Sequence, residues 1–329
     1  MEKLLYQSSA EAAVYTIQSD RVKATISALG ATIIRLSVPD RNGVWADVAL
    51  GFDAPETYLT APGNLGATIG RYAGRIANGT FCLNGETVEL TRNRGKHTIH
   101  GGSEGFHCRL WSVLHHDTNR LTLELTSPDG DQGFPGTLKV QADFTVTEGT
   151  LMLETRAIAD RDTVCSITNH TYWNLAGHDR GVIDGHVLQV DADTYLETDE
   201  ETIPTGQILA LPPEIDLRKA KVLTGLEMDH TLARTGASPS GRLYEPVSGR
   251  YLEVTTDLPG MQIYTGDHLK ENLAGKGGAI YGPRSGVCLE AQFFPDAPNH
   301  PAFPSPVLRT GEEVRHWICW RFGVAGDLP

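Results

Sequence analysis

The sequence predicts an all-β fold, a large antiparallel sandwich, and three observations support this prediction. Apolar residues alternate with polar ones over short segments, which is the period of a half-buried strand. The 35 glycines and 18 prolines are spread over all 329 residues, and such residues end strands and form turns. Helical periodicity is not sustained anywhere over about ten residues, so the alternation of strands and helices that a parallel α/β fold requires is missing.

Several strands can be placed from this alternation. Leucines at every second position predict a strand over residues 121–125. Residues 144–146 and 151–153 repeat the pattern on either side of Glu148-Gly149, which predicts a hairpin.

A second hairpin has a stronger turn signal. Phe81–Leu83 and Glu86–Val88 flank Asn84-Gly85, and this dipeptide supplies the positive φ angles that a tight two-residue turn needs. Ser248-Gly249 precedes a further candidate strand at 251–254. Because no repeat period and no low-complexity linker appears, the simplest organisation is one domain covering residues 1–329.

The charge of the chain restricts its partners. The formal net charge is −13, with acidic side chains spread along the sequence. A nucleic-acid-binding protein needs a basic stripe to meet phosphates, and an anionic membrane surface also attracts basic segments. We therefore expect no nucleic-acid partner and no membrane partner, but a neutral small molecule.

The five cysteines predict reduced thiols. Their number is odd and no Cys-x-x-Cys occurs, so neither a disulfide framework nor a structural zinc site is expected, and the thiols should be mostly buried. Met1–Tyr6 lacks the apolar run of a signal peptide, and no stretch reaches the length of a membrane-spanning helix. The sequence thus favours a cytoplasmic protein.

Four segments combine polar functional groups with aromatic and turn residues. They are Gly70–Gly79 leading to His97–Gly102, Thr168–Leu175, Gln262–His268 and Leu289–Asn299. On a strand, Glu290 and Gln292 would point to the same face. Burial would raise the pKa of Glu290 towards that of a useful base, while His170 can exchange a proton near neutral pH.

Other groups in these segments suit a polyhydroxylated ligand. Arg75 carries a fixed fork of donors, Asn169 both donates and accepts, and Tyr172 offers a flat apolar face. Each has a simpler interpretation when it is taken alone. His170 and Tyr172 could belong to the core, and Glu290 could form a structural ion pair with Arg75.

Two histidine pairs have weaker functional signals. His97 and His100 could form a metal pair, but two histidines among loop glycines are a weak zinc signal. His115-His116 is more simply the solvated end of a hairpin. We therefore expect no metal site.

Taken together, the segments resemble the aldose 1-epimerase (galactose mutarotase) family over almost the whole chain. The motifs that carry the resemblance occur in the family's order and at its approximate spacing. They are Gly70-Arg71 with Arg75–Gly79, His100-Gly101-Gly102, Asn169–Leu175, and Glu290 and Gln292 with Pro295–Asn299.

The resemblance implies a galactose mutarotase-like β-supersandwich with an open cleft. It also implies that Glu290 is the catalytic base and His170 the catalytic acid for interconverting the α and β anomers of a free aldose such as galactose or glucose. The substrate-binding residues that it implies are Arg75, His100, Asp229 and Gln262, to which we add Asn169 and Tyr172.

Three positions depart from the family pattern. Gly74 stands where the family usually has asparagine, Trp173 where phenylalanine is common, and Asp267-His268 where Asn-Phe is common. None removes a catalytic group, but all lie close in sequence to presumed cleft residues. They leave the preferred sugar open.

The expected reaction needs a proton removed from the C1 hydroxyl and a proton delivered to the ring oxygen, with no cofactor. It requires His170 to be protonated when Glu290 is ionised, and nearby carboxylates such as Asp229 would favour that charge. A glycoside hydrolase or lyase, and a non-catalytic carbohydrate-binding protein, are the alternatives. Hydrolysis usually needs two carboxylates, and a binding protein needs neither Glu290 nor His170. We expect a monomer or weak dimer.

Overall fold

The computed structural model describes residues 12–325 and consists of strands joined by loops and short 3₁₀ turns. Met1–Tyr6, on which the expectation about a signal peptide depends, lie outside this range. Within it, no helix has the length and apolar character needed to cross a membrane. The 3₁₀ turns are η1 Pro55–Leu59, η2 Ala77–Gly79, η3 Phe106–Cys108, η4 Asp131–Gly133, η5 Lys276–Gly278 and η6 Ala297–Asn299.

The largest sheet has nine strands, and every neighbouring pair in it is antiparallel. Its long central strands contain alternating buried and exposed residues, which is the pattern of a sheet with one face on the core. In spatial order the strands are β10 Ser112–His116, β11 Arg120–Ser127, β12 Leu138–Thr147, β13 Thr150–Ala159, β29 Glu313–Val324, β23 Arg250–Thr256, β22 Gly241–Tyr244, β17 Val187–Val190 and β20 Lys221–Val222.

Two smaller sheets cover the inner face of the nine-stranded sheet. The six-stranded sheet has the order β16 Tyr172–Trp173, β27 Val287–Gln292, β24 Gly260–Tyr264, β21 Asp229–Arg234, β18 Ala192–Thr198 and β19 Pro204–Ala210. The four-stranded sheet contains β1 Val14–Gln18, β2 Lys23–Ser27, β3 Thr32–Pro39 and β4 Trp45–Asp47.

Five two-stranded ladders connect these sheets or project from them. They are β15 Thr168–Asn169 with β5 Thr68–Ile69, β6 Arg75–Ile76 with β9 Thr98–Ile99, β7 Thr80–Leu83 with β8 Glu86–Glu89, β14 Thr163–Val164 with β28 Val307–Leu308, and β25 Leu273–Ala274 with β26 Ile280–Tyr281.

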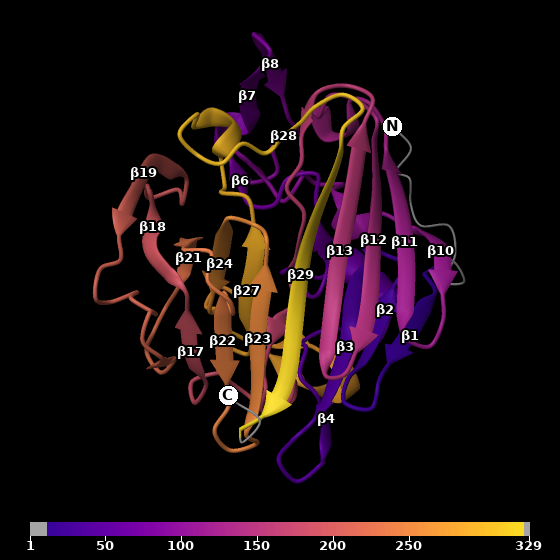
Figure 1. Ribbon diagram of the computed structural model, residues 1–329, viewed down its shortest axis with the longest axis vertical. Coiled ribbons are helices and arrows are strands. Elements are labelled where there is room, and N and C mark those ends of the chain that lie inside the picture. Colours follow the sequence, from indigo (N-terminus) through magenta and orange to yellow (C-terminus); the bar gives the residue numbers. More distant parts are fainter. Residues whose placement is uncertain (1–11, 326–329) are drawn as a thin grey trace.

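One hydrophobic core joins the three large sheets. In Figure 1 the nine-stranded sheet forms the front layer, with β1–β3 behind β11–β13, and β24 and β27 behind β22 and β23. The core contains Ile26 from the four-stranded sheet, Leu123 from the nine-stranded sheet and Ile263 from the six-stranded sheet, each fully buried. The architecture is therefore the predicted all-β sandwich, with one layer divided between two sheets.

The hairpins expected from turn residues are present. Asn84 and Gly85 have φ angles of 53° and 85° between β7 and β8. Glu148-Gly149 joins β12 to β13, and Ser248-Gly249 lies in the turn between β22 and β23. The turn residues predicted these hairpins correctly because turn formation depends on residues close in sequence.

The cysteines are free thiols, as expected, but their burial varies. Cys165 and Cys288 are buried, Cys108 and Cys319 are half-buried, and Cys82 is exposed. The expectation of burial is wrong for Cys82 because alternation on β7 turns Phe81 inward and the next side chain outward.

Candidate active site

Strand β27 separates the core from a cleft. Leu289 and Ala291 point into the hydrophobic core. Glu290 and Gln292 therefore point to the opposite face of the same strand, and both line the cleft. All six residues of β27 are buried, so its polar face is enclosed by other parts of the chain.

Neighbouring strands add polar groups to the same face. Gln262 of β24 lies directly opposite Glu290, and Asp229 of β21 lies opposite Tyr264 of β24. Tyr172 of β16 lies opposite Cys288 on the other side of β27. Since directly paired residues project to the same face of a sheet, four strands supply one polar surface.

The remaining groups come from segments that cross above this surface. Arg75 is on β6, which pairs with β9, and His100 follows directly after β9. His170 lies between β15 and β16. Arg75, His100, His170, Tyr172, Asp229, Gln262 and Glu290 all line a cavity of about 350 Å³.

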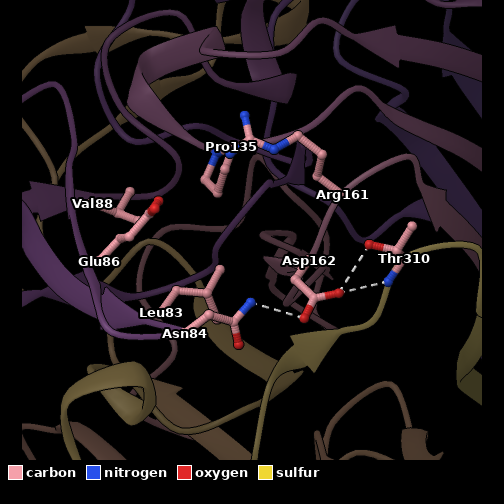
Figure 2. A pocket seen from close by; sticks show the side chains of 8 residues that line it. All are labelled: Leu83, Asn84, Glu86, Val88, Pro135, Arg161, Asp162 and Thr310. Carbon is pink, nitrogen blue, oxygen red and sulfur yellow. Dashed lines mark hydrogen bonds between the residues drawn. The ribbon is translucent and has the colours of Figure 1, made fainter.

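A second cavity of similar size has different chemistry. Its volume is about 340 Å³, and it lies beside the β7–β8 hairpin (Figure 2). Asp162, its central carboxylate, accepts hydrogen bonds from Asn84 at 3.0 Å and from the backbone and hydroxyl of Thr310 at 2.8 and 3.0 Å. These hydrogen bonds join the hairpin to the neighbouring loops, so the Asp162 carboxylate has a structural role in this cavity.

His170 and Glu290 face each other across the first cavity. His170 Nε2 lies 3.7 Å from Glu290 Oε1, which is too long for a direct hydrogen bond. Both side chains are buried. Oε2 of Glu290 has no hydrogen-bond partner among residues 12–325, so one carboxyl oxygen is available to a ligand.

Burial controls the protonation of this pair. It raises the pKa of Glu290 to about 8, assisted by the Asp229 carboxylate and opposed by Arg75. It lowers the pKa of His170 to about 4. The expectation that nearby carboxylates keep His170 protonated is therefore wrong for this arrangement, because the loss of hydration outweighs their attraction. Between these two values the pair holds one proton, and that proton is on Glu290.

His100 is a neutral hydrogen-bond donor in the cleft. Burial lowers its pKa well below the usual value, and the neighbouring His170 and Arg75 add to the effect. The backbone N–H of Gly74 donates to His100 Nδ1 at 3.3 Å. Since a backbone N–H can only donate, Nδ1 carries the lone pair and the ring proton is on Nε2.

Asp229, Gln262 and Arg75 form a connected polar group. Gln262 Nε2 donates to Asp229 Oδ1 at 2.6 Å, and Thr231 donates its hydroxyl proton to Gln262 Oε1. These two bonds fix the orientation of the amide. Arg75 Nη2 lies 3.7 Å from Asp229 Oδ2, so its ion-pair partner here is Asp229 and not Glu290. The arrangement presents donors and acceptors side by side, as sugar hydroxyls require.

The structure does not bring Asn169 to the cleft. Its side chain donates to the carbonyl of Gly66 at 2.9 Å and accepts a hydrogen bond from Thr171 at 2.5 Å. Asn169 is buried in these contacts and is absent from the cleft lining. Its position next to His170 in sequence suggested a binding role, but the chain turns between them, so Asn169 holds the segment that carries His170.

Of the residues that depart from the family pattern, two lie outside the cleft and two line it. Trp173 packs on Trp320 and Phe322 in the core, and Asp267 pairs with Arg284 at 3.0 Å. Gly74 and His268 do line the cleft. A Cβ at Gly74 would lie 2.9 Å from Pro295 Cγ, at a φ of +81°, so an asparagine here would require Pro295 to move.

Of the two histidine pairs, only His100 lines the cleft; His97, His115 and His116 lie outside it. His97 is buried, and its Nδ1 accepts the N–H of Asn78 at 3.0 Å, which supports the 3₁₀ turn η2. His115 and His116 are exposed on the edge strand β10, in agreement with the solvated position expected for them.

Several lining residues have no clear signal in the sequence. Loop residues supply this part of the wall, and their proximity depends on tertiary structure. They are Asn64, Asn93, Arg94 and Lys270. Cys288 does not line the cleft but contacts His170; its place on the same face of β27 as Glu290 could have been predicted, since the two are two residues apart.

His170, Cys288 and Glu290 are also a group with the donors that a metal ion requires. One ligand atom from each lies within 4.8 Å of the other two, and all three residues are buried. A thiol, an imidazole and a carboxylate are the ligand types of zinc. The expectation of no metal stays a prediction.

The chain is similar to sugar epimerases along nearly its full length. The profile of the aldose 1-epimerase family matches residues 13–320. Galactose mutarotase from Homo sapiens is 42% identical over 324 residues, 94% of each chain, and aldose 1-epimerase from Escherichia coli is 34% identical over 317 residues, 91% of each chain.

Solved structures give the same result. An aldose epimerase homologue from C. elegans superimposes with a TM-score of 0.90 at 32% identity, covering 95% of this chain and 99% of that one. Galactose 1-epimerase from Lactobacillus acidophilus superimposes with a TM-score of 0.82 at 27% identity, covering 94% and 93%.

Proposed function

The chain belongs to the aldose 1-epimerase family, and from this premise we propose that Glu290 and His170 carry out the proton transfers of its reaction. That reaction is the interconversion of the α and β anomers of an aldose, so the chain is an isomerase. The observation that supports the assignment is the 3.7 Å separation of His170 Nε2 from Glu290 Oε1, inside a cleft lined by hydroxyl-binding groups.

The proposed steps are two proton transfers and a rotation. Glu290 removes the proton of the C1 hydroxyl while His170 delivers a proton to the ring oxygen. The C1–O5 bond breaks, giving the open-chain aldehyde. Rotation about C1–C2 presents the other carbonyl face, and the ring closes with the two roles reversed. Each positioned proton transfer contributes about 10²–10⁴-fold in rate.

The protonation of the pair fits this scheme if one proton moves from Glu290 to His170 when the sugar binds. The single proton is on Glu290, whereas the first step starts from ionised Glu290 and protonated His170. These two forms contain the same number of protons and differ only in where the proton is. Sugar binding favours that shift, because the hydroxyl dipoles of the sugar replace the hydration that burial removed.

The other cleft residues bind and orient the sugar. Neutral His100 donates from Nε2 to an oxygen near the anomeric centre. Arg75 stabilises negative charge as it develops there. The fixed amide of Gln262 and the carboxylate of Asp229 hold the remaining hydroxyls, and Tyr172, which stacks on His170 with ring centroids 5.1 Å apart, packs against a C–H face of the sugar.

The substrate we propose is a neutral aldose of the galactose or glucose type. The human and L. acidophilus relatives are named for galactose, while Arg94, His268 and Lys270 on the rim of this cleft set the final preference. We further propose a cytoplasmic monomer or weak dimer that requires no cofactor. The five free thiols support a reducing compartment.

The proposal is tested by removing each catalytic group. Glu290→Gln keeps the shape of the side chain but removes the base, and it should lower kcat by about 10²–10⁴-fold with little change in KM. His170→Asn should have an effect of similar size. Both are measured by polarimetry on freshly dissolved α-D-glucose and α-D-galactose, after subtraction of the spontaneous rate.

Two matched variants control for loss of buried polar groups. Glu245 and His186 are buried and do not line the cleft, so Glu245→Gln and His186→Asn should retain the wild-type kcat. If Glu290→Gln turned over at a rate near that of the wild type, the base assignment would be wrong. An increase of KM alone in His170→Asn would make His170 a binding residue.

A further inference from the structure

Cys288 lies directly beside the catalytic histidine. Its Sγ is 3.5 Å from His170 Nδ1, and both side chains are buried. Glu290 is two residues further along β27, on the same face, 3.7 Å from His170 Nε2. The imidazole ring is thus held between a thiol on one nitrogen and a carboxyl group on the other.

The thiol is the group that can set the position of the ring proton. At 3.5 Å the Sγ–Nδ1 contact is within the range of a hydrogen bond to sulfur, whereas the carboxyl contact at 3.7 Å is too long for an N–H···O bond. Burial raises the pKa of the Cys288 thiol well above its usual range, and Glu290 adds to this. The thiol therefore keeps its proton and can donate it.

The aromatic groups around the ring have less influence on the position of its proton. His100 meets it edge-on at 5.3 Å and Tyr172 stacks on it at 5.1 Å, so both contact ring faces or edges rather than bond to a ring nitrogen. The backbone carbonyl of His170 is a second acceptor near the ring; it accepts the N–H of Gly66 at 2.9 Å and has a second lone pair, so it competes with the thiol in setting the position of the ring proton.

We propose that Cys288 is a positioning residue, whose S–H donates to His170 Nδ1 and so keeps the ring proton on Nε2, the nitrogen that faces Glu290. This inference depends on the proposed role of His170 as the acid. A neutral imidazole carries one ring proton. With Nδ1 occupied as an acceptor, that proton is on the side of the cleft where the sugar ring oxygen must receive it.

The tautomer can be observed directly. In the wild-type protein labelled with ¹⁵N-histidine, long-range ¹H–¹⁵N correlation distinguishes a protonated ring nitrogen from one with a lone pair. The His170 signals are those that disappear in His170→Asn. We expect Nε2 to be protonated and Nδ1 to carry the lone pair. A protonated Nδ1 in the wild type would overturn the proposal without any reference to a variant.

Kinetics test the consequence of losing the thiol. Cys288→Ala should lower kcat by about 3–10-fold, the effect of one modest hydrogen bond, with KM changed less than about twofold. It should also mix the two tautomers in the spectrum. Cys288→Ser, which keeps a donor, should restore most of the kcat. A kcat of Cys288→Ala equal to that of the wild type would contradict the proposal.

A matched control separates positioning from packing. Cys165 is a buried free thiol in the core shared by the three large sheets, whereas Cys288 belongs to a smaller buried cluster that also contains Tyr172. Cys165→Ala removes the same atom from a buried position, so it should lower the melting temperature as Cys288→Ala does but leave kcat and the His170 signals unchanged. Equal kinetic effects in both variants would assign the role of Cys288 to packing.

The failure of this inference can be told apart from failure of the proposed function. If His170→Asn retained the wild-type kcat, His170 would not be the acid and both proposals would be wrong. If His170→Asn were inactive while Cys288→Ala were fully active, only the role of Cys288 would be wrong. When both roles are correct, Cys288→Ala should cause no further loss in a His170→Asn background.

Discussion

At the scale of single residues, the reaction that we propose depends on two groups whose pKa values burial moves in opposite directions. Glu290 and His170 are both buried, and each prefers its uncharged form for that reason. The result is that the pair holds one proton over a broad pH range, and that this proton is on Glu290. Two testable consequences follow from this single proton.

The first concerns activity. If catalysis needs one proton on the pair, kcat/KM should be flat between the two apparent pKa values, about 4 and about 8, and fall on both sides. Below the range both groups are protonated, so the base is lost; above it the acid is lost. Polarimetry across pH checks this. An activity that rises through pH 8 would mean that only ionised Glu290 is needed.

The second concerns stability. The pKa of Glu290 in the folded state, about 8, is above its value in the unfolded chain, so the folded protein binds more protons in that interval. Its contribution to stability is therefore complete at low pH and is lost as pH rises through about 8. Glu290→Gln has no such dependence. Denaturant unfolding at about pH 5 and about pH 9 should show the variant gaining stability relative to wild type at the higher pH.

At the scale of elements, the site depends on strand alternation and on one tight turn. Alternation on β27 puts Leu289 into the core and Glu290 into the cleft. The turn after β9 places His100, and the following residue, Gly101, has a φ of +80°. A Cβ at Gly101 would lie 2.0 Å from the carbonyl oxygen of Gly70, so both the backbone angle and the space require glycine.

Gly101→Ala should consequently destabilise the protein and shift His100. We expect a loss of about 1–3 kcal/mol or more from strain, together with a higher KM if His100 binds the sugar as we propose. Gly43 is a matched control, since it has a φ of +78° but a Cβ added there would meet no heavy atom within 4 Å. Gly43→Ala should cost about 1 kcal/mol from the backbone angle alone and leave KM unchanged. Equal losses of stability in both variants would exclude a role for the contact with Gly70.

At the scale of the whole molecule, three sheets share one hydrophobic core. Ile26, Leu123 and Ile263 come from different sheets and belong to the same buried cluster. Trp173 of the six-stranded sheet packs on Trp320 and Phe322 of the nine-stranded sheet. Among residues 12–325, the three large sheets thus share their largest buried cluster, which supports the single-domain organisation that we propose.

Unfolding should accordingly be a single cooperative transition. Differential scanning calorimetry should give one peak whose calorimetric and van't Hoff enthalpies agree, and fluorescence and circular dichroism should report the same midpoint. Trp320→Phe, which reduces the contact between the two sheets, should lower that midpoint and keep one peak. Two resolved transitions would show that the sheets fold separately and would contradict the single-domain proposal.

The sequence by itself determined the class of fold and the hairpins, and it supplied the two groups of the catalytic pair that we propose. Alternation and turn chemistry act between residues a few positions apart, so the β7–β8 hairpin and the shared face of Glu290 and Gln292 could be derived locally. The identity of the pair and of the binding residues came from motifs spread over the chain, because their order and spacing match those of one family.

Only the tertiary structure decided which side chains meet. In the structure Asn169 lies outside the cleft, and Arg75 pairs with Asp229. Cys288 contacts His170, and loop residues such as Lys270 lie at the rim of the cleft. The structure also reversed the expected protonation of His170. Contacts between distant segments, and the burial that shifts a pKa, depend on how the sheets pack, and no property of neighbouring residues in the chain contains that information.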